Sequence, residues 1–271
     1  MAPVKIAVIG GTGVYENAHL DSPQQIAVET GFGRALFWRG CYQDREIYFL
    51  ARHGSGHALP PHLINYRANI AAIRKLEIDA VIATAAVGSL RPEMPPGSMV
   101  LLDQFIDFTK GRPSTFFEGG REGVVHVDLT VPYCPELRRA VLRAGGSLGE
   151  EIIDGGCYLC AEGPRFETPA EIRMFARWGA DLVGMTNVPE VVLAREAGLC
   201  YAAVALVSNF AAGISAAALS HQEVLAEMAR KKELLDRLLV ETALEITPER
   251  ACGCAAGAGP LNLEEAADER S

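Results

Sequence analysis

Three short segments of this sequence combine residue types that bind anions. They are Gly10-Gly11-Thr12-Gly13, Arg52-His53-Gly54-Ser55-Gly56-His57 and Val87-Gly88-Ser89-Leu90. Each segment follows or ends an apolar run, so each is expected where a strand ends. Glycine lets an anion approach backbone N–H groups closely, while arginine and histidine add side-chain donors. An ordinary turn explains any one of these segments taken alone. Their recurrence predicts that three strand ends meet at one anion site.

A second set of residues has the chemistry to hold a ring that carries polar groups. The stretch Ala161–Glu190 contains Arg165-Phe166-Glu167 near its start and Met185-Thr186-Asn187 near its end. Between these clusters, Thr168 is expected to cap a helix that has Glu171 in its first turn. The helix would tie both clusters to the same wall of a pocket, with an aromatic face, a carboxylate and a hydroxyl.

The segments that must position these residues predict an α/β fold. Apolar, β-branched runs predict strands, and apolar residues at helical spacing predict helices. Strands are expected at 4–9, 31–38, 41–51, 79–86, 99–105, 152–160, 180–185 and 199–207, and helices at 63–76, after Thr168, and at 136–145, 190–198 and 221–247. The polar loop 106–123 carries Phe116-Phe117 and is expected to be a lid, a subunit contact or disordered.

Composition bounds the class of protein. The 271 residues are 49% hydrophobic and 22% charged, which fits one α/β domain with a sizeable core. The domain is expected at 1–247, and the Gly/Ala-rich, then acidic tail 248–271 is expected to be flexible. A net charge of −9 argues against nucleic acid as the main partner. No apolar run is long enough to cross a membrane and the first residues do not form a signal peptide, so a cytoplasmic enzyme is expected.

Neither the histidines nor the cysteines predict a metal site. His53, His57 and His62 lack acidic or cysteine companions at familiar ligand spacing. The cysteines number seven, an odd count in mostly apolar contexts, which predicts reduced, buried thiols. The pair Cys252-Gly-Cys254 has the spacing for a local disulfide, but no second ligand pair that could complete a zinc site is evident in the sequence.

Several of these segments together resemble the trimeric purine nucleoside phosphorylase family, which includes methylthioadenosine phosphorylase. The matching motifs are GGTGVY, RHGSGH, TAAVGSL, GPRFETPAE, GADLVGMTNVPEVVLAREAG, SNF and SHQEV, and the match runs from Ile6 to about Glu245. The resemblance implies a single-domain α/β/α sandwich around a mixed, partly barrel-like sheet. It also implies a homotrimer with sites at subunit contacts, and cleavage of purine nucleosides by inorganic phosphate in purine salvage. Phosphate is then a co-substrate, and no metal or organic cofactor is expected.

The family's motifs assign roles to residues of this chain. Thr12, Arg52, His53, Ala85, Ala86 and Thr186 are expected to bind phosphate, whereas Met185, Phe166, His126 and His221 are expected to contact the nucleoside. Phe166 would stack on the purine and Met185 would lie under the ribose. His126 would reach into a neighbouring subunit's site near the 5′ group, and His221 would lie near the 5′-hydroxyl.

The departures from the family's patterns concern the purine base. Methylthioadenosine enzymes carry two aspartates where this chain has Asn209 and Ala211. Asn209 can direct its NH₂ toward a 6-oxo group and its C=O toward a protonated N7. Glu167 can accept from N1–H and from a 2-amino group, as in the 6-oxopurine enzymes. Asn209 and Glu167 are therefore expected to be catalytic, and with Ala211 to set specificity for inosine and guanosine.

Two other functions were compared with this one. An S-methyl-5′-thioinosine or S-methyl-5′-thioadenosine phosphorylase fits the same scaffold, and Ser89 follows the methylthioadenosine branch. A non-catalytic nucleoside-binding protein has little use for a phosphate site. Three points stay open. They are the preferred 5′ substituent of the substrate, the preference for inosine or guanosine, and whether the protein is a trimer or a hexamer. A paired-cysteine tail like Cys252-Gly-Cys254 is similar to one that forms a disulfide in heat-stable archaeal relatives, and this too stays open.

Overall fold

The computed structural model describes residues 4–11, 20–120, 123–215, 221–247, 249 and 251–261. Within them one mixed sheet follows the order β2-β3-β4-β1-β5-β10-β9-β7, with β11 pairing β5 and β6, and β8 pairing β6. The strands are β1 (Val4–Gly10), β2 (Asp21–Thr30), β3 (Gly33–Tyr42), β4 (Arg45–Ala51), β5 (Ala80–Ser89), β6 (Met99–Leu101), β7 (Gln104–Phe108), β8 (Ile152–Asp154), β9 (Cys157–Ala161), β10 (Leu182–Gly184) and β11 (Cys200–Phe210). The helices are α1 (Tyr66–Lys75), α2 (Pro135–Leu148), α3 (Pro169–Arg177), α4 (Asn187–Glu196) and α5 (His221–Glu245), with short 3₁₀ turns η1 (Ser55–His57), η2 (Pro61–Leu63) and η4 (Cys254–Gly257).

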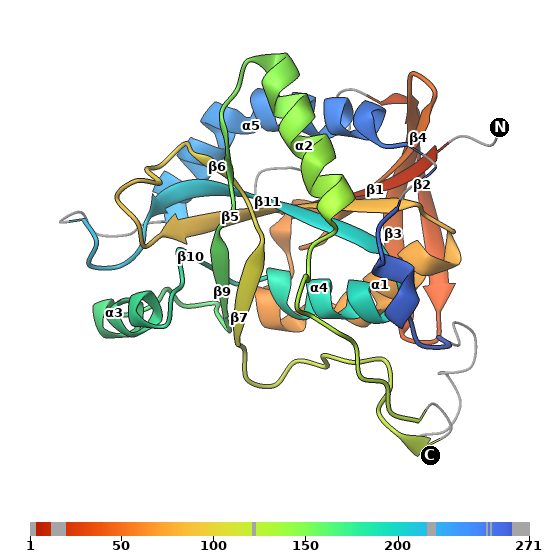
Figure 1. Cartoon of the computed structure of the whole chain (residues 1–271), viewed down its shortest axis with the longest axis horizontal. Helices are drawn as coiled ribbons and strands as arrows, with labels where there is room; N and C mark the ends of the chain where they lie inside the picture. Colours follow the sequence, from red (N-terminus) through yellow and green to blue (C-terminus); the bar gives the residue numbers. More distant parts are fainter. Residues whose placement is uncertain are drawn as a thin grey trace.

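Helices cover both faces of this sheet. In Figure 1, α2 and α5 lie over one face, and α1 and α4 lie over the other. Side chains of a strand alternate between the faces, so along β1 Ala7 and Ile9 pack with the α1 and α4 core. Ile6 and Val8 of the same strand pack with the α2 and α5 core. The expected α/β/α layering around a mixed sheet is confirmed.

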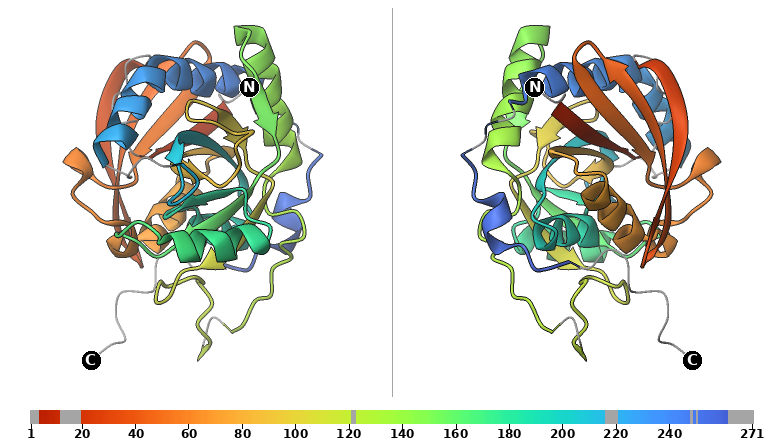
Figure 2. Two further views of the ribbon diagram at one scale, coloured as in Figure 1. Left: turned by 90° about the vertical axis from the view of Figure 1, so that its left-hand side faces the viewer. Right: turned by 90° about the vertical axis from the view of Figure 1, so that its right-hand side faces the viewer.

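The sheet branches at β5, which explains its partly closed shape. One edge of β5 pairs in parallel with β11 from Ala80 to Ser89. The other edge pairs first with β1, through Ala83, and later with the antiparallel β10, from Gly88. Figure 2 shows β2, β3 and β4 curling to one side of the body. Between the end of β1 and the start of β10, no strand of the described chain pairs with residues 84–87 of β5 at that edge.

The structure corrects four of the expected strands. The edge strand β2 lies before the expected strand 31–38, and most of its residues are exposed, so it carries no apolar run to reveal it. The turn expected at Arg39-Gly40 lies instead at Gln43, between β3 and β4. The expected strand 99–105 is divided into β6 and β7, and the expected strand 152–160 into β8 and β9. Gly155, with φ 103°, makes the second division.

Local capping confirms the expected start of α3. The Thr168 hydroxyl accepts from the Glu171 amide at 3.2 Å, and the Glu171 carboxylate accepts from the Thr168 amide at 2.7 Å. This reciprocal pair satisfies two donors that the first turn of a helix leaves free. The helix therefore begins at a defined residue, directly after the Arg165-Phe166-Glu167 cluster.

The loop after β7 packs more tightly than its sequence indicates. Phe116 and Phe117 are 1% and 5% exposed, so they are not the exposed aromatics that favoured a subunit contact, and the contact itself stays a prediction. The Phe116 ring lies 5.0 Å from the ring of Phe32, between centroids. Phe117 lies against Gly259. Apolar rings in a polar loop are buried here because the C-terminal segment and β2–β3 turn close over them.

Part of the expected tail also packs on the domain. Within 251–261, the Gly259 amide donates to the Glu196 carbonyl at 3.2 Å, and Cys254 is buried. The boundary at 247 stays a prediction, and 248, 250 and 262–271 lie outside the described residues. Among the described helices, none has the length and apolar character needed to cross a membrane.

Candidate active site

A cavity of about 400 Å³ opens at the unpaired edge of β5. Ten of the residues selected from the sequence line it: Arg52, His53, Ala85, Ala86, Phe166, Glu167, Met185, Thr186, Asn209 and Ala211. They come from β4, β5, the turn before α3, the β10–α4 junction and the end of β11. The three expected strand ends therefore meet, and the nucleobase cluster lies in the same cavity.

Three selected residues are placed differently. Thr12 lies outside the described residues, although its neighbour Gly11 lines the cavity. His221 begins α5, and its side chain lies outside the described part; Val224, in the same first turn, lines the cavity. His126 is exposed and does not line this cavity of its own chain.

The backbone of β5 supplies one half of an anion site. The Thr84 carbonyl points to the unpaired edge, where it accepts from Arg52 Nη1 at 2.8 Å. Backbone groups of alternate strand residues point to the same edge, so Ala86 directs its N–H there as well. The Thr84 hydroxyl accepts from the Gly11 amide at 3.0 Å and holds the end of β1 beside this edge. An added Cβ at Gly11 would lie 2.8 Å from the Thr84 carbonyl oxygen, so this approach requires glycine.

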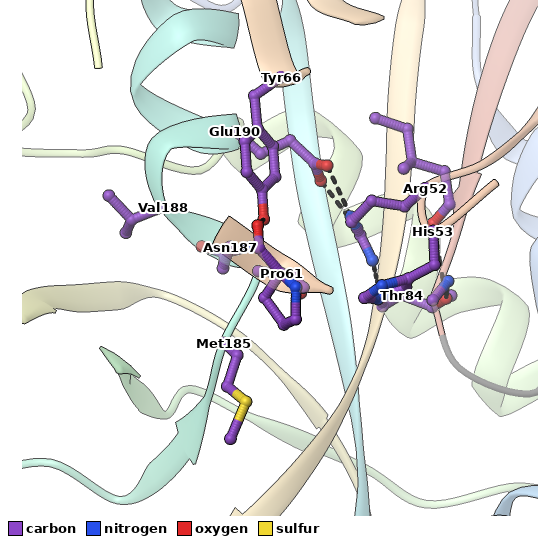
Figure 3. A network of polar contacts seen from close by, with 12 residues as sticks. Arg52, His53, Pro61, Tyr66, Thr84, Met185, Asn187, Val188 and Glu190 are labelled. Atoms are coloured by element: carbon purple, nitrogen blue, oxygen red, sulfur yellow. Dashed lines mark hydrogen bonds and ion pairs between the residues drawn. The ribbon is translucent and has the colours of Figure 1, made fainter. Parts of the chain in front are cut away.

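Arg52 is held by a buried carboxylate that sequence reasoning missed. Its Nε and Nη2 donate to the two oxygens of Glu190 at 2.7 and 2.8 Å, as Figure 3 shows. Both side chains are 1% exposed. Burial lowers the pKa of Arg52, but the charge and hydrogen bonds of Glu190 raise it. The net effect is a raised pKa, so the guanidinium stays charged. Two of the five guanidinium N–H donors remain for a ligand.

A chain of buried polar groups orients Glu190 in turn. Its Oε1 accepts from the Tyr201 hydroxyl at 2.7 Å, and that hydroxyl accepts from Asn187 Nδ2 at 3.1 Å. Asn187 Oδ1 accepts from the Tyr133 hydroxyl at 2.5 Å. Arg52 is thus aligned by groups from β11, α4 and the segment before α2. The only sign of Glu190 in the sequence is that an acidic residue stands among apolar residues, in VPEVVL.

Arg112 is a second residue that the sequence did not single out. It lies in the loop after β7, and its guanidinium is 2% exposed. It donates to backbone carbonyls of Met185 at 2.7 Å, Val188 at 2.9 Å and Glu162 at 2.6 Å. It therefore joins the end of β9 to the β10–α4 junction and fixes the wall that carries Met185 and Thr186. An isolated arginine in a polar loop gives no sequence signal for this role.

His53 is neutral at physiological pH. Its Nδ1 lies 2.8 Å from the Leu59 carbonyl, which can only accept, so Nδ1 carries the proton and Nε2 is left without one. Burial, with a smaller contribution from the charges of Arg52 and His57, lowers the pKa of His53 to about 4. Its ring stacks on that of His57 with centroids 4.1 Å apart.

The other half of the cavity combines an aromatic ring, a carboxylate and an amide. Phe166 remains 38% exposed at the cavity. Glu167 is 9% exposed, and its Oε1 has no hydrogen-bond partner among the described residues. Burial raises the pKa of this carboxyl. Asn209 Oδ1 accepts from the Ser208 hydroxyl at 2.8 Å, and Nδ2 donates to the Phe210 carbonyl at 2.8 Å. These two contacts orient the amide and leave one N–H and one lone pair for a ligand.

Replacing Glu190 should destabilise the protein through Arg52. We expect Glu190→Gln to lower the free energy of unfolding by about 3–5 kcal/mol, because it leaves a buried guanidinium without its counter-charge. Glu196→Gln is the matched control, since Glu196 is also buried but accepts from the neutral donors Thr115 Oγ1 and Phe116 N. Urea unfolding at constant protein concentration measures both. Equal losses in the two variants would contradict the charge pairing described above.

His53 should make stability depend on pH. Below about pH 6.5 the unfolded chain binds a proton at His53, whereas the folded chain does not until about pH 4. Stability is therefore lost as the pH falls through this window, and the effect is absent above it. Between pH 7 and 5 we expect wild type to lose about 1–2 kcal/mol more than His53→Gln. His62→Gln, at an exposed histidine, is the control and should behave as wild type.

Comparison with known proteins agrees with this geometry. The sequence profile of the phosphorylase superfamily matches residues 5–245. The chain is 51% identical over 260 residues to a probable 6-oxopurine nucleoside phosphorylase of Moorella thermoacetica, covering 96% of this chain and 100% of that protein. It is 49% identical to the 6-oxopurine nucleoside phosphorylase of Pyrococcus furiosus, over 92% of this chain and 96% of that protein. Methylthioadenosine phosphorylase from Schistosoma mansoni in complex with adenine superposes with a TM-score of 0.86 at 32% identity, covering 91% of this chain and 93% of that chain. The chain belongs to the phosphorylase superfamily.

Proposed function

We propose that this protein is a 6-oxopurine nucleoside phosphorylase, which uses inorganic phosphate to cleave inosine and guanosine to the free base and ribose 1-phosphate. The observation that carries the proposal is Glu167, a buried carboxylate that lines the cavity and has one oxygen without a partner among the described residues, together with Phe166 and with an amide rather than an acid at Asn209. The two relatives described above are about half identical to this chain over nearly their whole length, and each is named a 6-oxopurine nucleoside phosphorylase or a probable one.

Phosphate is assigned to the half of the cavity formed by β4, β5 and α4. The remaining Arg52 N–H groups and the Ala86 amide supply donors there. Thr186 precedes α4 and lines the cavity, and its hydroxyl makes no capping contact with that helix. The bare Nε2 of neutral His53 can accept the proton of a monoprotonated phosphate. Because Glu190 balances the charge of Arg52, the site relies on directed donors more than on net positive charge.

The same arrangement supports the bond cleavage. Breaking the glycosidic bond leaves a cationic ribosyl centre and an electron-rich purine. Phosphate held beside the anomeric carbon stabilises the cation and then bonds to it, while the electron pair of the broken bond stays with the base. Asn209 stabilises N7 of the leaving purine, and Glu167 accepts N1–H at the far edge of the ring. Met185 also lines the cavity, and we assign the ribose to the space beside it.

We further propose that the protein works as a homotrimer in which His126 serves a neighbouring site. His126 belongs to the segment 123–131, which leads from the loop below the body of the subunit in Figure 1 back toward α2. The same segment exposes Val124 at 69% and Val131 at 56%, apolar surface that a subunit contact would cover. In a single chain Phe166 is still 38% exposed, and a neighbouring subunit that closes the cavity would cover this ring.

A substrate panel tests the reaction and the reading of the base. With phosphate present, we expect release of hypoxanthine from inosine and of guanine from guanosine, but no adenine from methylthioadenosine.

Asn209→Asp should shift the ratio of kcat/KM toward 6-aminopurines, because a carboxylate accepts from a 6-amino group and repels a 6-oxo group. Base release is measured by chromatography. An unchanged ratio would remove the role of Asn209, and binding without release at any phosphate concentration would show a binding protein instead.

Glu167 should control both the acid limb of activity and the use of guanosine. Its raised pKa means that the ionised form is lost at a higher pH than for an ordinary glutamate, so kcat/KM falls as the pH falls toward that value. Glu167→Gln should abolish this limb and lower kcat/KM at neutral pH by about 10- to 100-fold. Guanosine should lose more than inosine, since the amide NH₂ opposes the 2-amino donor. Glu93→Gln, at an exposed glutamate that does not line the cavity, is the control and should keep the wild-type pH profile.

A further inference from the structure

Four cysteines that are far apart in the sequence form one cluster. Cys134, Cys200, Cys252 and Cys254 place all four sulfur atoms within 4.8 Å of one another. Cys134, Cys200 and Cys254 are buried, and Cys252 is half-buried. The sequence offered Cys252 and Cys254 without a second ligand pair, and the fold supplies that pair.

Three different segments hold these side chains in place. Cys134 directly precedes α2, and its amide donates to the Tyr201 carbonyl at 2.8 Å, next to Cys200 at the start of β11. Cys254 begins the short turn η4 and belongs to the core cluster that includes residues of α2, β11 and α5, while Cys252 packs against that core. Two ligands therefore come from the rigid domain and two from the C-terminal segment.

The spacing of the sulfur atoms fits a tetrahedral metal ion. A zinc ion with Zn–S bonds of about 2.3 Å separates its four sulfurs by about 3.8 Å. Cys200 and Cys252 have their sulfurs 3.3 Å apart, and the largest separation in the cluster is 4.8 Å. The sulfurs need to move by only about 1 Å or less to reach the tetrahedron. Four thiolates select a soft or borderline ion and offer nothing to magnesium or calcium.

The surroundings also favour loss of a thiol proton. Cys134 lies at the start of α2, where the helix dipole stabilises negative charge.

We propose that Cys134, Cys200, Cys252 and Cys254 bind one zinc ion, which fastens the C-terminal segment to the domain. Binding is a ligand exchange: hydrated zinc releases its water ligands, four S–H protons pass to solvent, four Zn–S bonds form, and no electron is transferred. All four positions are taken by protein, so the ion is structural. The site lies apart from the cavity, because none of the four cysteines lines it.

The ion would also support the phosphate half of the active site. Cys134 and Cys200 are the chain neighbours of Tyr133 and Tyr201, whose hydroxyls orient Asn187 and Glu190. The C-terminal segment that carries the other two ligands contacts the Glu196 carbonyl through Gly259. Fixing the cluster therefore limits movement in β11, in the segment before α2 and at the end of α4.

The test measures metal content and thiol content of the whole protein. Protein purified with a phosphine reductant and incubated with zinc, then freed of excess ion, should hold one zinc per chain by elemental analysis. Denaturation with a chelator should then release all seven thiols. Cobalt in place of zinc should show the intense visible absorption of a tetrahedral thiolate complex. The zinc-loaded protein should have a higher thermal midpoint than the metal-free form.

Variants separate the cluster from the other cysteines. Cys252→Ser and Cys254→Ser should each weaken zinc binding by more than about 100-fold, since even partners outside the ligand set are worth 10- to 100-fold. Cys41→Ser and Cys157→Ser, outside the cluster, should bind zinc as wild type does. The proposal fails if reduced protein takes up no zinc. It fails equally if protein isolated without reductant holds no metal and shows fewer than seven thiols, because the cluster then forms disulfides instead.

Discussion

The active site depends on keeping one guanidinium charged and correctly aimed in a place that water barely reaches. Arg52 is 2% exposed, and an isolated charge at such a position is strongly disfavoured. The bidentate contact with Glu190 compensates the charge and fixes the plane of the group at the same time. The third contact, with the Thr84 carbonyl, ties this plane to the sheet. In the proposed function, phosphate would meet donors that need no reorganisation.

The active site also depends on the sheet, which provides a strand edge without a partner. An unpaired edge is normally a liability because its N–H and C=O groups attract other chains. Here β5 changes partner, from the parallel β1 to the antiparallel β10, and the free edge lies inside the molecule at the cavity. The two halves of the site follow from this change, since β1 and β4 bring Gly11 and Arg52, whereas β10 brings Met185 and Thr186.

Two arginines thus carry out complementary tasks. Arg52 lines the cavity, while Arg112 uses its donors on the carbonyls of Glu162, Met185 and Val188. Both are buried, and both need partners from distant segments. The cysteine cluster has the same character, because it joins the start of α2, the start of β11 and the C-terminal segment. Long-range polar contacts of this kind fix a single arrangement of segments that apolar packing alone would leave looser.

The amino-acid sequence by itself determined the local elements and the chemistry of the cavity. The capping box at Thr168, the apolar runs of β1, β5 and β11, and the glycine turns after them are local signals, and they identified the residues that meet at the cavity. The sequence failed where a local signal was absent, as in the exposed edge strand β2 and in the buried Phe116. Only the tertiary structure decided which groups are partners. Arg52 and Glu190 are 138 positions apart, and nothing in either neighbourhood encodes the other. Their contact, like that of Cys134 with Cys254, exists because packing of the sheet and helices brings remote segments within bonding distance.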